Sequence, residues 1–235
     1  MKVCVISNSH LASVKKGADQ LDESSTEVHL TFFGSPNRGI AQLRPNKEEG
    51  CLSSNNEKVR EHLAQSSGGL SEISYADYDA FLIYGLFLTI PQLDQRLSSR
   101  VMRQTLDDTV DLSLAMRTVK KLHKLGSKPV FCSAEPLLSE NRFDRGHKRP
   151  SSNVLPLNKT QALLKERIED ANTWFIEQPI GSIVDDFSTK AKYSKSSLRF
   201  DGGEHLARDI RHMNADYGQL YLETALNFIQ EKAAT

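Results

Sequence analysis

Two short segments near opposite ends of the chain carry the residue types that nucleophilic catalysis needs. Ser9 follows an apolar run at residues 3–6, and Asp209 stands three positions before His212. A hydroxyl becomes a nucleophile when a nearby base takes its proton and an acid holds that base in place. Ser9, His212 and Asp209 could fill these three roles if the fold brings the two segments together.

Each segment alone has a simpler structural explanation. Asn8 and Ser9 are both favoured N-caps for a helix at Leu11, while Asp209 could cap the last helix and leave His212 at the surface. The spacing of Asp209 and His212 nevertheless puts carboxylate and imidazole on one side of a loop, with the second ring nitrogen free to face a serine. His205 is a rival base that we rank below His212, because it lacks an acid at this spacing.

The segments between these two motifs predict an α/β fold. Apolar runs predict strands at residues 3–6, 28–33, 80–84 and 129–133. Residues 174–178 could be a fifth strand or the end of the preceding helix, and we favour the strand because Pro179 ends the segment. Apolar residues at helical spacing predict four helical regions: one from Leu11, one across 92–125, one around 164–171 and one across 222–229. The second region is expected to break near 107–108 and to end at a Gly126 cap. Strands that alternate with helices predict parallel pairing and a site beyond the carboxyl ends of the strands.

That edge of the sheet is expected to collect several polar segments. Ser9, Gly85, Glu135 and the loop 139–149 all follow predicted strand ends. Residues 36–72 are polar and rich in turn residues, so we interpret them as an insertion, such as a hairpin, within a single domain that spans 1–235.

Taken together, these motifs resemble the SGNH/GDSL hydrolase superfamily along the whole chain. Ser7-Asn8-Ser9 stands where that family has Gly-Asp-Ser, and Asp209-x-x-His212 matches its Asp-x-x-His block. The resemblance implies a three-layer α/β/α fold with a flavodoxin-like parallel sheet of order 2-1-3-4-5 and helices on both faces. It also implies acyl-ester hydrolysis through an acyl-enzyme on Ser9, with the N–H groups of Ser9 and Gly85 in the oxyanion hole.

One family element has no counterpart here. The block Gly-x-Asn-Asp, which gives an asparagine side chain to the oxyanion hole, is replaced by Tyr84-Gly85-Leu86-Phe87. Loss of one such donor costs about 10²–10³-fold in rate. Asn8 and Asn214 are our candidates to replace the missing amide.

The substrate is predicted mainly by analogy. Short acyl groups, such as acetyl on a carbohydrate, are favoured because the chain has no long apolar lid. His10, Arg142 and Arg145 are candidate substrate-binding residues, and the basic loop 141–149 could hold a carboxylate or phosphate group or could simply be solvated. The alternatives are an acyltransferase with the same acyl-enzyme, a non-catalytic binding protein that keeps the fold, and an unrelated flavodoxin-like protein that matches by chance.

Composition excludes several partner classes from the prediction. The chain has 235 residues, with 30 Lys and Arg against 30 Asp and Glu, so net charge gives no reason to expect nucleic acid or an anionic membrane as partner. Cys4, Cys51 and Cys132 are scattered, and we expect reduced thiols, no metal and no cofactor. No apolar stretch reaches membrane-spanning length, so a cytoplasmic protein is expected.

Overall fold

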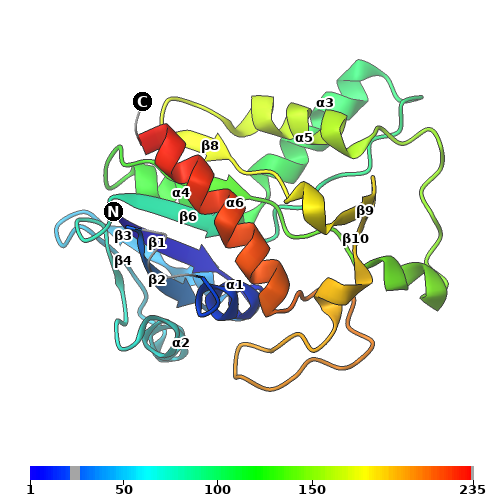
Figure 1. Ribbon diagram of the computed structural model, residues 1–235. Coiled ribbons are helices and arrows are strands. Elements are labelled where there is room, and N and C mark those ends of the chain that lie inside the picture. Colours follow the sequence, from blue (N-terminus) through cyan, green and yellow to red (C-terminus); the bar gives the residue numbers. More distant parts are fainter. Residues whose placement is uncertain (22–26, 234–235) are drawn as a thin grey trace.

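A sheet of five parallel strands forms the centre of the protein (Figure 1). The computed structural model describes residues 1–21 and 27–233. The strands lie in the order β2-β1-β6-β7-β8. Their bounds are β1 (Lys2–Ser7), β2 (His29–Gly34), β6 (Ala80–Tyr84), β7 (Val130–Ser133) and β8 (Thr173–Phe175). Since β6, β7 and β8 are the third, fourth and fifth strands of this sheet, the predicted order 2-1-3-4-5 is confirmed.

Helices cover both faces of the sheet, which gives three layers (Figure 1). They are α1 (Leu11–Ala18), α2 (Glu57–Ser67), α3 (Ser99–Asp111), α4 (Leu114–His123), α5 (Leu157–Ile168) and α6 (Ala215–Ala233). Successive side chains of a strand point to opposite faces, so β1 contributes to two cores. Val3 and Val5 pack with α1 and α6, whereas Cys4 and Ile6 pack with the helices of the other face.

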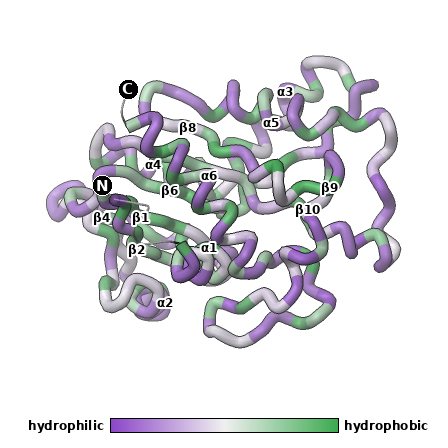
Figure 2. Tube along the Cα trace, in the orientation of Figure 1, coloured by the Kyte–Doolittle hydropathy of each residue, from purple (hydrophilic) through white to green (hydrophobic). Residues whose placement is uncertain are grey.

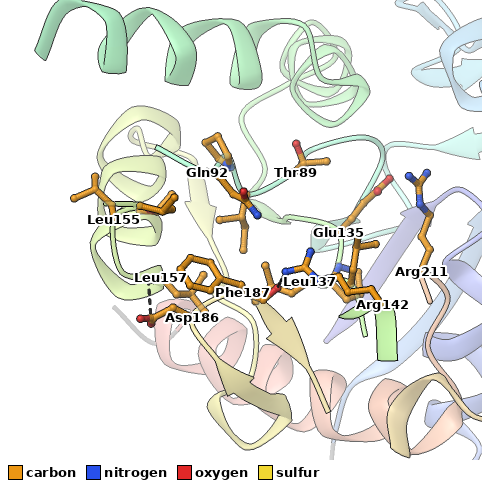
Figure 3. A pocket seen from close by; sticks show the side chains of 16 residues that line it. Thr89, Gln92, Glu135, Leu137, Arg142, Leu155, Leu157, Asp186, Phe187 and Arg211 are labelled. Carbon is orange, nitrogen blue, oxygen red and sulfur yellow. Dashed lines mark hydrogen bonds between the residues drawn. The ribbon is translucent and has the colours of Figure 1, made fainter. Parts of the chain in front are cut away.

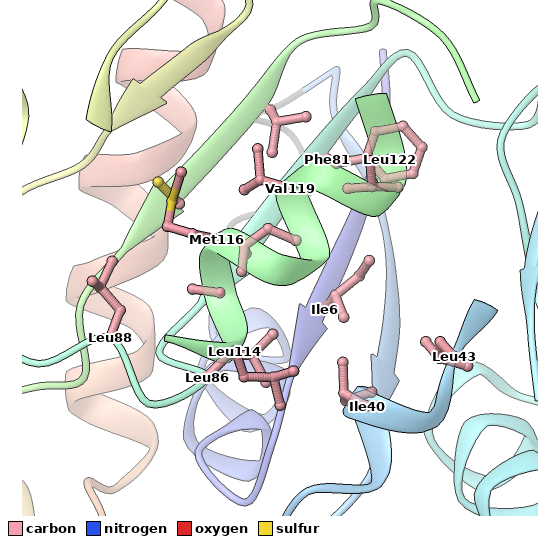
Figure 4. Packing of buried hydrophobic residues seen from close by; sticks show 14 of the residues in the cluster. Ile6, Ile40, Leu43, Phe81, Leu86, Leu88, Leu114, Met116, Val119 and Leu122 are labelled. Atoms are coloured by element: carbon pink, nitrogen blue, oxygen red, sulfur yellow. The ribbon is translucent and has the colours of Figure 1, made fainter. Parts of the chain in front are cut away.

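The apolar residues of the second core gather under α4 (Figure 4). Val119 and Leu122 of this helix are buried against Ile6 and Phe81 of the sheet. Along the whole trace, the central strands are the most hydrophobic segments (Figure 2). No helix among the described residues is long and apolar enough to cross a membrane, and the cellular location stays a prediction.

The region 92–125 differs from its prediction in three places. Its first helix begins at Ser99, and the break falls at Leu112 and Ser113 rather than near 107–108. The Ser113 hydroxyl accepts the N–H of Met116 at 3.1 Å and so starts α4, and Leu112, between the two helices, is 67 % exposed. The helix then ends at His123, with Lys124 rather than Gly126 at the cap position.

The polar region 36–72 holds more regular structure than its composition indicated. Strands β3 (Arg44–Asn46) and β4 (Cys51–Ser53) form the expected hairpin, and β5 (Ile73–Ser74) extends it to a small antiparallel sheet. Helix α2 was missed, because only Val59, Leu63 and Ser66 of its residues are buried. The remaining short elements are η2 (Gly39–Gln42), η3 (Glu140–Arg145), η4 (Ile180–Ser182), β9 (Ile183–Asp185), β10 (Ser188–Thr189) and η5 (Ala191–Ser194).

Helices α1 and α6 pack unusually closely, through a glycine on each. A Cβ on Gly218 would overlap the backbone of Ser13 in α1, and a Cβ on Gly17 would overlap the backbone of α6 at Gln219. Figure 1 shows the start of α6 lying beside α1. Because α1 follows Ser9 and α6 follows His212, this contact draws the two candidate motifs together.

Substituting Gly218 therefore tests how much the structure depends on this contact. Gly218→Ala is expected to lower the free energy of unfolding in urea by at least about 1 kcal/mol, since overpacking costs roughly 1–3 kcal/mol and outweighs the better helix propensity of Ala. Gly181→Ala is the matched control, because its added Cβ would meet only the Leu220 side chain at an ordinary 3.7 Å. Equal stability of the two variants would contradict the close packing.

Candidate active site

Ser9 occupies the tight turn between β1 and α1. The turn is held by Asn8, whose Oδ1 accepts the N–H of His10 at 3.1 Å, while Ser9 caps nothing. Ser9 is half-buried, and its own N–H donates to no atom of the described residues. The expected alternative role of Ser9 as a helix cap is therefore wrong, and its N–H is free to donate to a developing charge near the start of α1.

The side chains of Ser9, His212 and Asp209 form one continuous hydrogen-bonded chain. Nε2 of His212 lies 3.0 Å from the Ser9 Oγ, and Nδ1 of His212 lies 2.9 Å from Oδ2 of Asp209. A carboxylate can only accept, so Nδ1 carries the proton and Nε2 is left as an acceptor for the serine hydroxyl. This is the arrangement in which an imidazole can remove the serine proton.

Asp209 is held as an anion in this chain. Its Oδ1 accepts the backbone N–H groups of Arg211 at 2.8 Å and His212 at 2.9 Å. Burial alone would raise the pKa of Asp209, but the hydrogen bonds from His212 and from the backbone outweigh it and hold that pKa well below its usual value. Asp209 does not cap α6, because the Asn214 Oδ1 fills that position by accepting the N–H of Tyr217 at 3.1 Å.

His205 shares this carboxylate, which the sequence did not indicate. Its ring stacks on that of His212 at 3.9 Å between centroids and 7° between planes, and its Nδ1 lies 3.3 Å from Asp209 Oδ2. The expectation that His205 lacks an acid is thus wrong. Burial, and then the proximity of the His212 ring, lower the pKa of His205. His205 supports the base from behind, whereas only His212 reaches Ser9.

His10 flanks the other face of His212. It is buried, with ring centroids 4.9 Å apart, and its Nε2 lies 3.7 Å from Oε1 of Glu135. That Oε1 also accepts the Phe87 N–H at 3.1 Å. Burial would raise the pKa of Glu135, but His10, the Phe87 N–H and the charge of Arg211 together lower it. His10 therefore couples the candidate base to a buried carboxylate.

Two of the predicted oxyanion donors are already engaged. The Gly85 N–H donates to the Ser133 carbonyl at 3.1 Å, and Nδ2 of Asn214 donates to the carbonyls of Lys192 and Lys195 at 3.0 and 3.1 Å. Both predictions are corrected, because a donor used inside the fold cannot also stabilise a developing charge. Nδ2 of Asn8 makes no hydrogen bond with the described residues, so Asn8 stays a candidate.

The donor atoms of His205, Asp209 and His212 lie within 4.8 Å of one another and could hold a metal ion. The spacing of these three residues in the sequence did not indicate a metal site. Asp209 and His212 already satisfy each other by hydrogen bonding, and an ion at Nδ1 of His212 would break that bond. The arrangement of the described residues thus fits a proton-transfer chain without a metal, and the predicted absence of a metal stays a prediction.

His205, Asp209 and His212 line an open surface hollow. A separate cavity of about 240 Å³ lies on the far side of Glu135 and Arg211 (Figure 3). Glu135, Arg142 and Arg211 contribute to its wall. Of the two arginines predicted to bind substrate, Arg142 lines the cavity, whereas Arg145 donates to the carbonyls of Ala207 and Arg208 in the loop before Asp209. Arg145 therefore supports the loop that carries the candidate acid.

Comparison with known proteins finds similarity only at the level of solved structures. No protein-family model and no curated protein matches the chain. The periplasmic domain of a lipopolysaccharide acetyltransferase from Salmonella ser. Paratyphi A aligns with a TM-score of 0.48 and 8 % identity, over 97 % of this chain and 83 % of that chain.

Two further structures have a similar architecture. A carbohydrate acetylesterase family member from Sinorhizobium meliloti aligns with a TM-score of 0.43 and 9 % identity over 100 % of both chains. A protein from Bacteroides ovatus described as a GDSL-like lipase aligns with a TM-score of 0.41 and 16 % identity, over 98 % of this chain and 52 % of that chain. Because these structures share 16 % identity or less with the chain, they assign no role to individual residues, and those roles rest on the distances given above.

The lowered pKa of Asp209 predicts how stability depends on pH. A carboxylate whose pKa is lower in the folded state stabilises the fold above its unfolded pKa of about 3.9, and this contribution is lost as pH falls. The difference in unfolding free energy between wild type and Asp209→Asn should therefore be larger at about pH 7 than at about pH 3. The exposed Asp77→Asn serves as control, and a difference for Asp209→Asn that does not change with pH would contradict the assignment.

Proposed function

We propose that the protein is a serine esterase that removes short acyl groups, such as acetyl from a carbohydrate. The observation that carries this proposal is the pair of distances from His212 to Ser9 Oγ, 3.0 Å, and to Asp209 Oδ2, 2.9 Å. An unprotonated Nε2 facing a half-buried serine hydroxyl is suited to general-base activation of that serine.

The reaction would proceed in two steps. Nε2 of His212 takes the Ser9 proton while Oγ attacks the ester carbonyl, and the same proton then passes to the departing alcohol. Water next gives a proton to Nε2 and attacks the acyl group, and Ser9 regains its proton as the carboxylic acid leaves. Asp209 would stabilise the imidazolium in both steps, and the Ser9 N–H with Nδ2 of Asn8 would bind the oxyanion.

An acyltransferase is the second candidate. It would form the same acyl group on Ser9, but a sugar hydroxyl instead of water would attack it. The hollow lined by His205, Asp209 and His212 offers space for such an acceptor, which is the observation that favours this candidate. Supplying a sugar alcohol together with the ester and measuring acylated sugar against free acid separates the two reactions.

Removing the hydroxyl tests the nucleophile. Ser9→Ala should reduce turnover of short-chain and sugar-acetyl esters by about 10⁶-fold, because no other group can form the acyl-enzyme. A fluorophosphonate probe should label Ser9 in the wild type and leave Ser9→Ala unlabelled. A folded wild type that neither labels nor hydrolyses any ester would favour a non-catalytic binding protein.

The role of Asn8 as an oxyanion donor can be tested separately from its role in the turn. Asn8→Asp keeps the oxygen that accepts the His10 N–H but removes the Nδ2 donor. We expect kcat to fall about 10²–10³-fold, the cost of one oxyanion donor. The thermal midpoint of Asn8→Asp should stay near that of the wild type. Asn214→Asp should instead lose stability, because it removes the Nδ2 hydrogen bonds to the carbonyls of Lys192 and Lys195. An unchanged kcat in Asn8→Asp would exclude Asn8 from the oxyanion hole.

A further inference from the structure

Helix α4 carries a row of cations on the side that faces η2 and β3. Arg117, Lys121 and Lys124 are spaced by four and three residues, so they lie along one face of the helix. Because α4 packs against η2 and β3, Arg44 at the start of β3 lies close to this row. We call these four residues the basic cluster. It lies on the side of the sheet opposite α1 and α6, and none of its members belongs to the candidate active site.

Two side chains of the basic cluster converge on one backbone oxygen. Lys121 Nζ donates to the Ala41 carbonyl at 3.0 Å, and Arg44 Nη1 donates to the same carbonyl at 3.4 Å. Lys121 is half-buried, whereas Arg44, Arg117 and Lys124 are exposed. The Lys121 ammonium is thus fixed beside a guanidinium from another element, and the other three members are open to a ligand from solvent.

No acid balances the charge of the basic cluster. None of its four members forms an ion pair with a described residue. The neighbouring Lys120, by contrast, lies 3.4 Å from Asp111. Burial, followed by the charges of the other three members, lowers the pKa of Lys121 to about 8. The charges that contribute to this shift, from α4 and from β3, are all positive.

The stability of α4 does not account for this arrangement. Like charges four residues apart on a helix, as at Arg117 and Lys121, are destabilising. Cations near the last turn of a helix are favoured by its dipole, but Arg117 belongs to the first turn, where a positive charge is unfavourable. Arg44 lies outside the helix altogether. An anion from outside the chain would relieve the repulsion within the basic cluster.

We propose that the basic cluster binds a phosphate or diphosphate group of a small free ligand. A phosphate ester carries close to two negative charges at neutral pH on three acceptor oxygens, whereas a carboxylate carries one charge. Four cations from two elements match the higher charge. Arginine offers a planar fork to such oxygens, and lysine binds them as a point charge. The inference is independent of the proposed esterase function, because it uses no residue of the candidate active site.

Calorimetry on the wild type tests the preference for phosphate. In about 0.15 M NaCl at about pH 7, pyrophosphate and inorganic phosphate should bind, and acetate should bind at least about tenfold more weakly or not at all. Equal binding of acetate and phosphate, or no binding of either phosphate probe, overturns the proposal. Binding of phosphatidylserine vesicles or of an oligonucleotide without binding of pyrophosphate overturns it as well, because the ligand would then be a membrane or a nucleic acid.

Matched charge removals locate the ligand. Lys121→Gln and Arg44→Gln should each weaken pyrophosphate binding by about tenfold, the strength of a hydrogen bond to a charged group. Lys120→Gln removes a positive charge from the same helix but outside the basic cluster, and should change the affinity by less than about twofold, because Lys120 is paired and screened by salt. Equal losses in Lys120→Gln and Lys121→Gln would overturn the site. If Lys121→Gln does not fold, the comparison of the exposed Arg44→Gln with Lys120→Gln decides.

The pH dependence of the Lys121 effect provides a second readout. Only the protonated ammonium attracts a phosphate, and a pKa of about 8 leaves Lys121 mostly charged at about pH 7 and mostly neutral at about pH 9. The affinity advantage of the wild type over Lys121→Gln should therefore fall from about tenfold at about pH 7 to about twofold at about pH 9. Lys120→Gln should follow the wild type across this range. A constant advantage would overturn the assignment of the phosphate to Lys121.

Discussion

The close approach of α1 and α6 is the constraint on which the rest of the structure depends. Each helix follows one half of the candidate site, since Ser9 precedes α1 and His212 precedes α6. Gly17 and Gly218 let the backbones meet where any side chain would hold them apart. The hydrogen bond of 3.0 Å between His212 and Ser9 tolerates little displacement, so packing inside the first core sets the geometry of the site.

Electrostatics then decides which histidine can act as the base. The His212 ring contacts two other imidazoles: it stacks on His205 and lies tilted by 31° against His10. Asp209 contacts His205 and His212, but only His212 donates to it from both a backbone N–H and a ring nitrogen. Because burial and the proximity of His212 lower the pKa of His205, the neutral form of that ring is favoured where it packs on His212. The proton acceptor nearest Ser9 is thereby fixed by its surroundings.

Much of this arrangement could be predicted from local patterns. Strand β6 matches its predicted bounds, and the spacing of Asp209 and His212 was sufficient to place them on one side of a loop. Helix α2 could not be found, because its buried face is too narrow to produce an apolar stripe. The Gly85 N–H was misassigned for another reason: whether a backbone donor is free depends on strand pairing, here with Ser133, which no residue type reveals.

The loop after β6 shows how local backbone strain shapes the site. Leu86 and Phe87 have φ values of 52° and 60°, a left-handed conformation that costs roughly 1–2 kcal/mol per non-glycine residue. The conformation persists because the Phe87 N–H is held by Glu135, and the Leu86 carbonyl accepts the N–H of Ala115 at 3.0 Å. The loop thus folds onto the buried carboxylate of Glu135.

That carboxylate lies among partners that favour its charged form. Glu135 stays ionised because its positive and N–H partners outweigh its burial, and Arg211 supplies part of that balance. Arg142 of the same wall donates to the Phe187 carbonyl at 2.8 Å and makes no ion pair with the described residues. The loop after β6 therefore fixes a carboxylate next to His10, the ring that contacts the candidate base, and the strained backbone of Leu86 and Phe87 is part of what holds that charge in place.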